Sequence, residues 1–360
     1  MQMKHILHLY FMRKTALILL GISFFYTAYA QHSSNEDGKK VDKEQLETKD
    51  YLPEIHGTIR TKFEYQTEMN ASRFEVRNAR LSATGNVLPS VAYKAEIDLS
   101  DEGQIKMLDA YARIFLLQDL TVTAGQMRVP FTIDAHRSPH QQYFANRSFI
   151  AKQVGNVRDV GMTIGYNVEG ALPIILEGGF YNGSGLTNQK EWHKEVNFSG
   201  KAQFLPAKGV NVTLSVQSIK PETVRMNSFD VGTYYEFGRF HIEGEYLYKH
   251  YSDNAFNGVH SVNSFINYDL PVSKVFQKIS FLARYDMMTN HSNGTPNSTT
   301  GLLTITDYKR HRVTGGITCS LSKAFKTDLR LNFEKYFYAK NSIAKESEQD
   351  KIVIELMIRF

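Results

Sequence analysis

Short segments from residue 55 onward alternate regularly between apolar and polar residues. In the first segment, Ile55, Ile59 and Phe63 share one face, whereas Arg60 and Lys62 share the other. A period of two residues with this contrast predicts a β-strand that has one apolar and one hydrated face. About sixteen such segments follow one another, near residues 55–66, 73–85, 91–99, 106–117, 119–128, 159–168, 172–181, 195–205, 210–219, 228–238, 239–250, 258–269, 277–288, 310–321, 326–338 and 350–360.

This number of strands favours a closed barrel in a membrane. No segment after residue 30 has the roughly 20 apolar residues that a spanning helix needs. In hydrocarbon every backbone polar group needs an internal partner, so only helices and closed barrels can span. A single soluble sandwich core could not cover so many alternating strands. The sequence therefore predicts an all-β, transmembrane antiparallel β-barrel of about 16 strands over residues 55–360, wide enough to hold water.

Two places break the regular pattern. The phase slips between Val76 and Leu81, which indicates either a β-bulge or a wrong assignment. The longest gap between predicted strands, residues 129–158, mixes aromatic residues with cations such as Arg137 and Arg147. We expect this segment to be an inward-folded constriction loop that narrows the lumen.

The first 30 residues have the pattern of an export signal. Arg13 and Lys14 precede an apolar run over residues 15–28, and a small-x-small site ends at Ala30. These features predict a cleaved signal peptide over residues 1–30, because the apolar core is too short for a membrane anchor. Residues 31–54 are charged and contain few large apolar groups, which predicts a disordered periplasmic leader. The expected location is the outer membrane of a Gram-negative bacterium.

The composition agrees with a barrel that is hydrated inside and apolar outside. The chain has 20 Tyr, 23 Phe and 24 Gly beside a single Cys and a single Trp. Loss of Lys4, Arg13 and Lys14 with the signal peptide would lower the formal net charge from +5 to +2. That excess is too small to indicate a nucleic-acid partner.

Several motifs, in order, resemble those of the phosphate-selective porin O/P family. They are Phe74–Leu81, Tyr93–Asp98, Leu108–Ala112, Gly125–Phe131, Arg158–Gly161 and Phe180–Gly185. The resemblance implies a sixteen-stranded porin, usually a homotrimer, whose third extracellular loop folds inward and whose pore is lined by cations. It also implies small anionic solutes such as phosphate, a surround of outer-membrane lipid, and no cofactor, metal or catalytic residue. Asn78 departs from the family, since a second basic residue beside Arg77 is expected there.

Basic residues on the hydrated faces are the candidate pore-lining and anion-binding residues. Those around the long gap are Arg128, Arg137, Arg147, Lys152 and Arg158, and those on early strands are Arg60, Lys62, Arg77, Arg80 and Arg113. Arg137, Arg147 and Arg158 are the strongest candidates, because guanidinium planes match phosphate and carboxylate geometry. The alternative for each is an ion pair within the wall, since the same faces carry acids. These acids are Glu64, Glu96, Asp98, Asp109, Glu177, Glu243, Glu245 and Glu355.

The function predicted from these features is passive diffusion of small solutes, in which wall charge biases which ions enter. Two alternatives remain open from the sequence. One is an outer-membrane barrel hydrolase, which would need a Ser–His pair with a third group orienting the His. The other is a non-conducting binding or adhesion barrel that uses its long loops.

Overall fold

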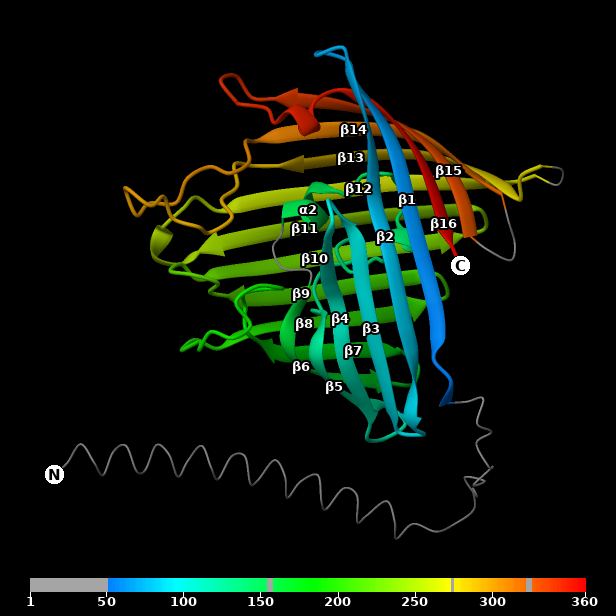
Figure 1. Cartoon of the computed structure of the whole chain (residues 1–360), viewed down its shortest axis with the longest axis vertical. Helices are drawn as coiled ribbons and strands as arrows, with labels where there is room; N and C mark the ends of the chain where they lie inside the picture. Colours follow the sequence, from blue (N-terminus) through cyan, green and yellow to red (C-terminus); the bar gives the residue numbers. More distant parts are fainter. Residues whose placement is uncertain (1–50, 154–157, 273–274, 322–325) are drawn as a thin grey trace, which may run out of the picture. The chain divides into compact units, whose positions relative to one another are not determined.

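In the computed structural model, residues 51–360 are described except 154–157, 273–274 and 322–325. They form a closed barrel of sixteen antiparallel strands (Figure 1). The strands are β1 Glu54–Gln66, β2 Ala71–Leu88, β3 Val91–Asp101, β4 Gln104–Phe115, β5 Leu120–Arg128, β6 Arg158–Val168, β7 Ile174–Tyr181, β8 Asn197–Ala207, β9 Val210–Ile219, β10 Met226–Phe237, β11 Phe240–Tyr251, β12 Val259–Pro271, β13 Lys278–Met288, β14 Arg310–Ser320, β15 Lys326–Tyr338 and β16 Lys351–Arg359. The predicted fold class is confirmed, and each predicted segment coincides with one strand to within a few residues. The predicted signal peptide and residues 31–50 of the predicted leader lie outside the described residues, and both stay predictions.

Each strand pairs with its neighbours along the chain, and β1 also pairs with β16. At this seam the Gly57 N–H donates to the Phe360 carbonyl at 2.7 Å, and the Phe360 N–H donates back at 3.1 Å. The wall therefore has no free strand edge, and its backbone groups find their partners within it.

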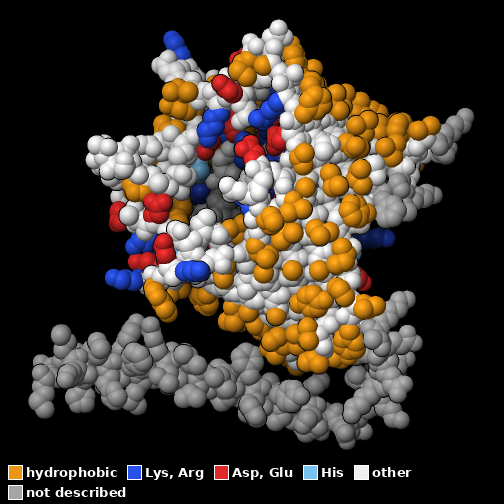
Figure 2. Space-filling view, viewed as in Figure 1, with side chains coloured by type: hydrophobic (Ala, Val, Ile, Leu, Met, Phe, Trp, Pro, Cys, Tyr) orange, Lys and Arg blue, Asp and Glu red, His pale blue; other side chains and the backbone are white. Residues whose placement is uncertain are grey.

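The alternation predicted for β1 is present, with its polar face turned inward. Arg60 and Lys62 are only 2% and 5% exposed, whereas the outward-facing Ile59 is 40% exposed. Figure 2 shows hydrophobic side chains spread over the outside of the wall and charged ones gathered around a hollow. This inverted burial is what a barrel in hydrocarbon with a hydrated lumen requires.

The phase slip in the second predicted strand is a β-bulge. Arg60 pairs with Asn78, but the next residue, Thr61, pairs with Val76. Arg77 is therefore the extra residue of β2, and the alternation changes phase across it.

The two rims of the barrel differ in their connections. At the turn rim, strands are joined by short segments such as residues 89–90, 208–209 and 238–239. At the loop rim, several connections are much longer, among them 182–196 and 289–309, although residues 102–103 join β3 to β4 in a short turn. This alternation is typical of membrane barrels.

The connection between β5 and β6 lies inside the barrel. It contains the 3-10 helix η2, Pro139–Gln141, and the short helix α2, Phe149–Gln153. The other helical turns are η3, Ser252–Asn254, and η4, Glu346–Glu348. No helix of the described residues is long and apolar enough to cross a membrane.

Apolar packing inside the barrel is concentrated where this connection meets the wall. Three clusters of buried residues each combine its side chains with side chains of the strands. The first is Phe149 with Ile219, Met226, Tyr251, Val259, Met288 and Tyr336, the second is Val129, Phe131 and Ile150 with Tyr181 and Leu247, and the third is Phe144 with Phe265 and Leu282. Buried apolar area of this kind stabilises the inward position of the connection.

The Phe360 ring covers Gly57 at the seam, so a side chain there should weaken closure. A Cβ atom at Gly57 would overlap the ring, whereas one at Gly315, on β14, would meet no atom within 4 Å. We expect Gly57→Val to lower the free energy of unfolding by about 1–3 kcal/mol, the usual cost of overpacking. Gly315→Val is the matched control. Heat-dependent mobility on denaturing gels measures the folded fraction, and equal midpoints for the two variants would contradict the prediction.

Candidate functional site

Residues 129–153 cross the lumen and are fastened to β11 near their beginning. The Glu245 carboxylate accepts hydrogen bonds from the backbone N–H groups of Ile133 and Asp134. Next to it, Arg137 forms a two-pronged ion pair with Glu243, with one N–O distance of 2.7 Å. Two acids on the inner face of one strand thus hold the segment by backbone and side chain.

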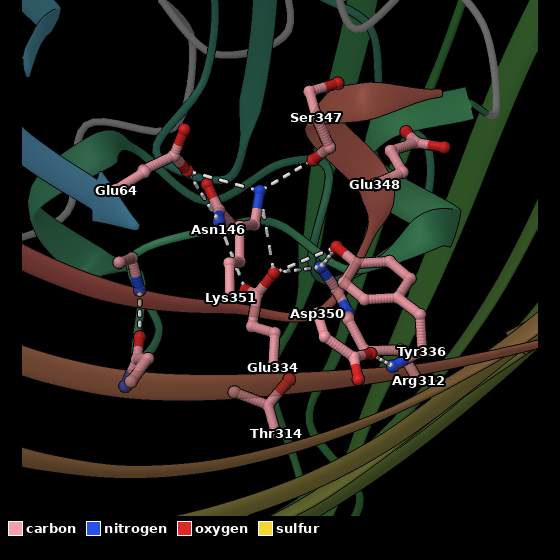
Figure 3. A network of polar contacts seen from close by, with 12 residues as sticks. Glu64, Asn146, Arg312, Thr314, Glu334, Tyr336, Ser347, Glu348, Asp350 and Lys351 are labelled. Carbon is pink, nitrogen blue, oxygen red and sulfur yellow. Dashed lines mark hydrogen bonds and ion pairs between the residues drawn. The ribbon is translucent and has the colours of Figure 1, made fainter. Parts of the chain in front are cut away.

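The far end of the segment is fastened to β1 and to β13–β15. Figure 3 shows Asn146 between Glu64 and Glu334, to which its amide donates at 3.4 and 3.1 Å. Arg284 donates to the Asn146 carbonyl at 2.9 Å, and Arg312 donates to the Arg147 carbonyl at 2.7 Å. Since the segment joins β5 to β6, and β13–β15 lie on the other side of the closed barrel from these two strands, the segment spans the barrel interior.

Asp134 joins the two ends of the segment to each other. Its carboxylate accepts hydrogen bonds from the Ser148 hydroxyl at 2.5 Å and from Arg137 at 3.4 Å. Burial alone would raise the pKa of Asp134, but Arg137 and the Ser148 hydrogen bond outweigh it and lower this pKa. A carboxyl with a lowered pKa stabilises the folded state above its unfolded pKa, so this contribution is present at neutral pH. It is lost as the pH falls below about 4 toward the lowered value.

The two histidines of the segment carry no charge at neutral pH. Burial, with Lys201 and Arg128 nearby, lowers the pKa of His136 well below its usual value. Burial, with Arg359 and Lys326, lowers the pKa of His140 to about 3. The charge of the lumen near the segment is therefore set by arginine, lysine and carboxylate groups.

Six of the ten predicted site residues form ion pairs with acids of the wall or loops. The pairs are Arg60–Glu355 at 2.6 Å, Lys62–Glu64 at 2.8 Å, Arg80–Asp98 at 2.9 Å, Arg158–Asp109 at 2.6 Å, Arg137–Glu243 and Lys152–Glu348. Each of these charges is largely offset by its partner at short range.

The other four predicted site residues have no acidic partner within ion-pair distance in the described part of the chain. They are Arg77, Arg113, Arg128 and Arg147. Arg128 donates to three carbonyls of the inward segment, the shortest bond being 3.0 Å to Arg137. Arg113 donates to Thr123 at 3.0 Å and lies over the Tyr111 ring. The guanidinium groups of Arg77 and Arg147 have neither a hydrogen bond nor an ion pair to any described residue.

Arg77 and Arg147 line one cavity on the loop-rim side of the inward segment. Its volume is about 970 Å³. Four more arginines line it, namely Arg60, Arg73, Arg80 and Arg158, together with three acids, Glu75, Asp98 and Glu102. Burial lowers the pKa of Arg147, Asp134 raises it, and the cations Arg80, Arg77 and Arg60 lower it further. Arg147 is thus held against other positive charges, and an anion placed among them would relieve that repulsion.

The structure distributes the predicted site residues over three cavities. The arginine-lined cavity holds Arg60, Arg77, Arg80, Arg147 and Arg158. A second cavity of about 490 Å³, nearer the turn rim, holds Arg113 and Arg128, and a third of about 540 Å³ holds Arg137. Lys62 and Lys152 line none of these three.

Sequence reasoning missed some of the residues that matter here. Arg73 lines the arginine-lined cavity, and it stands at the start of a predicted strand beside the candidate Arg77. Asn146 and Asp134 fasten the inward segment, but no local pattern distinguishes them from ordinary loop residues. Glu243 and Glu245 are recognisable in the sequence as acids of the hydrated faces, but not as the residues that hold the inward segment. Across the described residues, no group of three or more His, Cys, Asp or Glu could hold a metal ion.

Solved structures with the same architecture define the class of the protein. The chain is similar to OprB of Pseudomonas putida, with a TM-score of 0.63 and 9% identity over 88% of this chain and 95% of that one. It is also similar to OmpF of Salmonella typhi, with a TM-score of 0.61 and 12% identity over 86% and 98%. An anion-selective porin from Comamonas acidovorans matches with a TM-score of 0.57 and 12% identity over 86% and 98%. At such low identity these likenesses show the fold, which is that of a porin barrel.

The sequence places the chain within a particular porin family. The profile of the family "Phosphate-selective porin O and P" matches residues 54–254, and the chain belongs to this family. No curated protein matches the chain. The protein is therefore an outer-membrane porin, a channel and not an enzyme, which confirms the predicted class and location. Its turn rim corresponds to the periplasmic side and its loop rim to the extracellular side.

The ion pair between Arg137 and Glu243 should determine how firmly the inward segment is held. Glu243→Gln leaves the buried Arg137 with only the longer contact to Asp134 at 3.4 Å, and loss of one partner of a buried ion pair costs up to about 3–5 kcal/mol. We expect hydrogen exchange across residues 131–148 to accelerate more than about tenfold, as measured by mass spectrometry. Glu236→Gln is the control, because that side chain is 59% exposed. Equal exchange in the two variants would show that the pair does not hold the segment.

Proposed function

We propose that this porin prefers anions and that phosphate is among the solutes it passes. The observation that carries the proposal is the pair of arginines without acidic partners, Arg77 and Arg147, in a cavity lined by four further arginines. Uncompensated charge in a confined lumen concentrates ions of the opposite sign. The planar guanidinium group also suits the oxygens of phosphate, to which it can donate two parallel hydrogen bonds.

In this proposal the ten predicted site residues have four different roles. Arg77 and Arg147 attract the anion, and Arg60, Arg80 and Arg158 surround it with charges that are partly offset by the wall. Arg113 and Arg128 continue the positive lining toward the periplasm. Arg137, Lys62 and Lys152 serve mainly as ion-pair partners that hold the inward segment and the loops. The inward segment would act as the constriction, since it occupies the lumen between the cavities.

Removal of either unpartnered arginine should reduce the anion preference. Reversal potentials under a KCl gradient in a planar bilayer give the ratio of chloride to potassium permeability. We expect Arg147→Gln and Arg77→Gln each to lower this ratio about twofold or more. Phosphate should block the chloride current, and its half-blocking concentration should rise about tenfold on loss of one charged hydrogen-bond donor.

Arg225→Gln provides the control, because it removes the same charge from the loop rim, where Arg225 pairs with Glu195 at 3.1 Å. Its permeability ratio should match that of the unchanged protein. A conducting barrel with no anion preference, or one in which all three variants behave alike, would refute the proposed role of Arg77 and Arg147.

We further propose that the protein assembles as a homotrimer. Support comes from a structural relative with the same fold, OmpT of Vibrio cholerae, which is described in a trimer form and matches with a TM-score of 0.56 and 13% identity. We expect native mass spectrometry of the detergent-solubilised protein to give three times the mass of one chain. A single-chain mass under conditions that preserve the folded barrel would refute the trimer.

A further inference from the structure

Three successive peptide groups of the inward segment are held by three arginines of the wall. Arg60 of β1, Arg284 of β13 and Arg312 of β14 donate to the carbonyls of residues 145–147, in that order, at 2.7, 2.9 and 2.7 Å. We refer to residues 145–147 as the clamped stretch. Because each of its carbonyl oxygens is bound by a cation, none of them is left to oppose an anion in the lumen.

The backbone N–H groups at the two ends of this region are bound to the wall as well. The Ala145 N–H donates to Asn332 of β15 at 2.8 Å, and the Phe149 N–H donates to Asp286 of β13 at 3.1 Å. The backbone on both sides of residue 147 is therefore fixed to the wall by donors and by acceptors.

Two of the three arginines also lie over aromatic rings that flank the clamped stretch. The guanidinium carbon of Arg284 is 4.3 Å from the centre of the Phe144 ring, and that of Arg312 is 4.7 Å from the centre of the Phe149 ring. A guanidinium group can stack through its face and donate hydrogen bonds through its edge at the same time, which an ammonium group cannot. Arg284 and Arg312 thus hold the backbone and the flanking side chains together.

The clamped stretch determines where the charge of Arg147 lies. Among residues 129–153, Arg147 alone lines the arginine-lined cavity. The neighbouring side chain, Asn146, is turned instead toward Glu64 and Glu334 (Figure 3). Because the Arg147 guanidinium group bonds to no described residue, the backbone that carries it sets the region that this charge can occupy.

Arg284 and Arg312 contribute little net charge of their own to the lumen. Both lie beside two acids, Asp286 and Glu334, with distances of 2.6 and 3.4 Å for Arg312 and of 4.0 and 3.9 Å for Arg284. Two cations and two acids balance one another, and neither arginine lines any of the three cavities. Their effect on a passing anion must therefore act through the residue that they position.

We propose that Arg284 and Arg312 are positioning residues that determine the anion preference by holding Arg147 in place. They fix the clamped stretch so that the Arg147 charge lies within the arginine-lined cavity, and they do not touch the anion themselves. This inference rests on the proposed function and names the wall residues on which the preference depends. Loss of either arginine's bond to the backbone releases the stretch, and the Arg147 charge is then no longer held at one place.

Charge-preserving substitutions separate the position of Arg147 from the charge of the wall. Arg312→Lys keeps the positive charge, but one ammonium group cannot replace the five hydrogen bonds that Arg312 forms with described residues. We expect reversal potentials under a KCl gradient to show a ratio of chloride to potassium permeability about twofold lower, as in Arg147→Gln. Arg284→Lys, which loses the bond to the backbone at residue 146, should give the same result.

Arg330→Lys is the matched control. Arg330 is also a buried arginine, and it pairs with Glu355 and Asp328 but forms no bond to the inward segment. Its permeability ratio should equal that of the unchanged protein. Hydrogen exchange at residues 145–149, measured by mass spectrometry, should accelerate about tenfold in Arg312→Lys and not in Arg330→Lys. Heat-dependent gel mobility and the KCl conductance confirm that each variant is folded and open.

The double variant of Arg312→Lys with Arg147→Gln tests whether Arg312 acts through Arg147. Its permeability ratio should equal that of Arg147→Gln alone, because no charge remains at residue 147 to be positioned. A further fall in the double variant, as large as the fall caused by Arg312→Lys alone, overturns the positioning role.

The single variants distinguish this inference from the proposed function. A ratio that falls in Arg147→Gln but stays unchanged in both Arg312→Lys and Arg284→Lys overturns the positioning role and leaves the anion preference of Arg147 intact. A ratio that Arg147→Gln does not change overturns the proposed role of Arg147 and this inference with it.

Discussion

The requirement that every backbone polar group in the wall be paired within the wall governs the rest of the structure. Because of this requirement the strands close into a barrel, and the side chains of each strand point either toward hydrocarbon or toward the lumen. Polar side chains have nowhere to go but inward, so charges that a soluble protein would spread over its surface are confined to a narrow interior. Arg60, Glu355 and Arg330 illustrate the result, since all three are almost completely buried and form one chain of ion pairs.

Confinement of charge also explains how a connection between two strands can lie inside the barrel. The inward segment has apolar residues such as Phe149 and Ile150 that pack against the wall. Its backbone N–H and carbonyl groups form hydrogen bonds with charged side chains of the wall. Glu245 accepts backbone N–H groups, whereas Arg284 and Arg312 donate to carbonyls. Opposite ends of the segment are thus matched to acceptors on β11 and to donors on β13 and β14, which fixes its direction across the lumen.

The sequence predicts the wall well and the lumen only partly. Alternation has a period of two whatever the tertiary contacts, so the strands, their faces and even the phase slip between Val76 and Leu81 can be found locally. The sequence does not show which acid each cation pairs with. Arg60 and Glu355, for example, are 295 residues apart and meet only because the barrel closes. Arg137 and Arg147 look equivalent in the sequence, yet Arg137 pairs with Glu243, whereas no acid of the described residues lies within ion-pair distance of Arg147. The anchors at Asp134 and Asn146 carry no local signal at all.

The pairing of Gly57 with Phe360 bears on how the chain reaches its final state. Contacts between residues so distant in the sequence carry a high entropic cost of loop closure, and folds that depend on them form slowly. Until that last pair forms, the first and final strands each present an open edge able to join a strand of another molecule. The unclosed chain is therefore vulnerable to aggregation until its first and last strands pair.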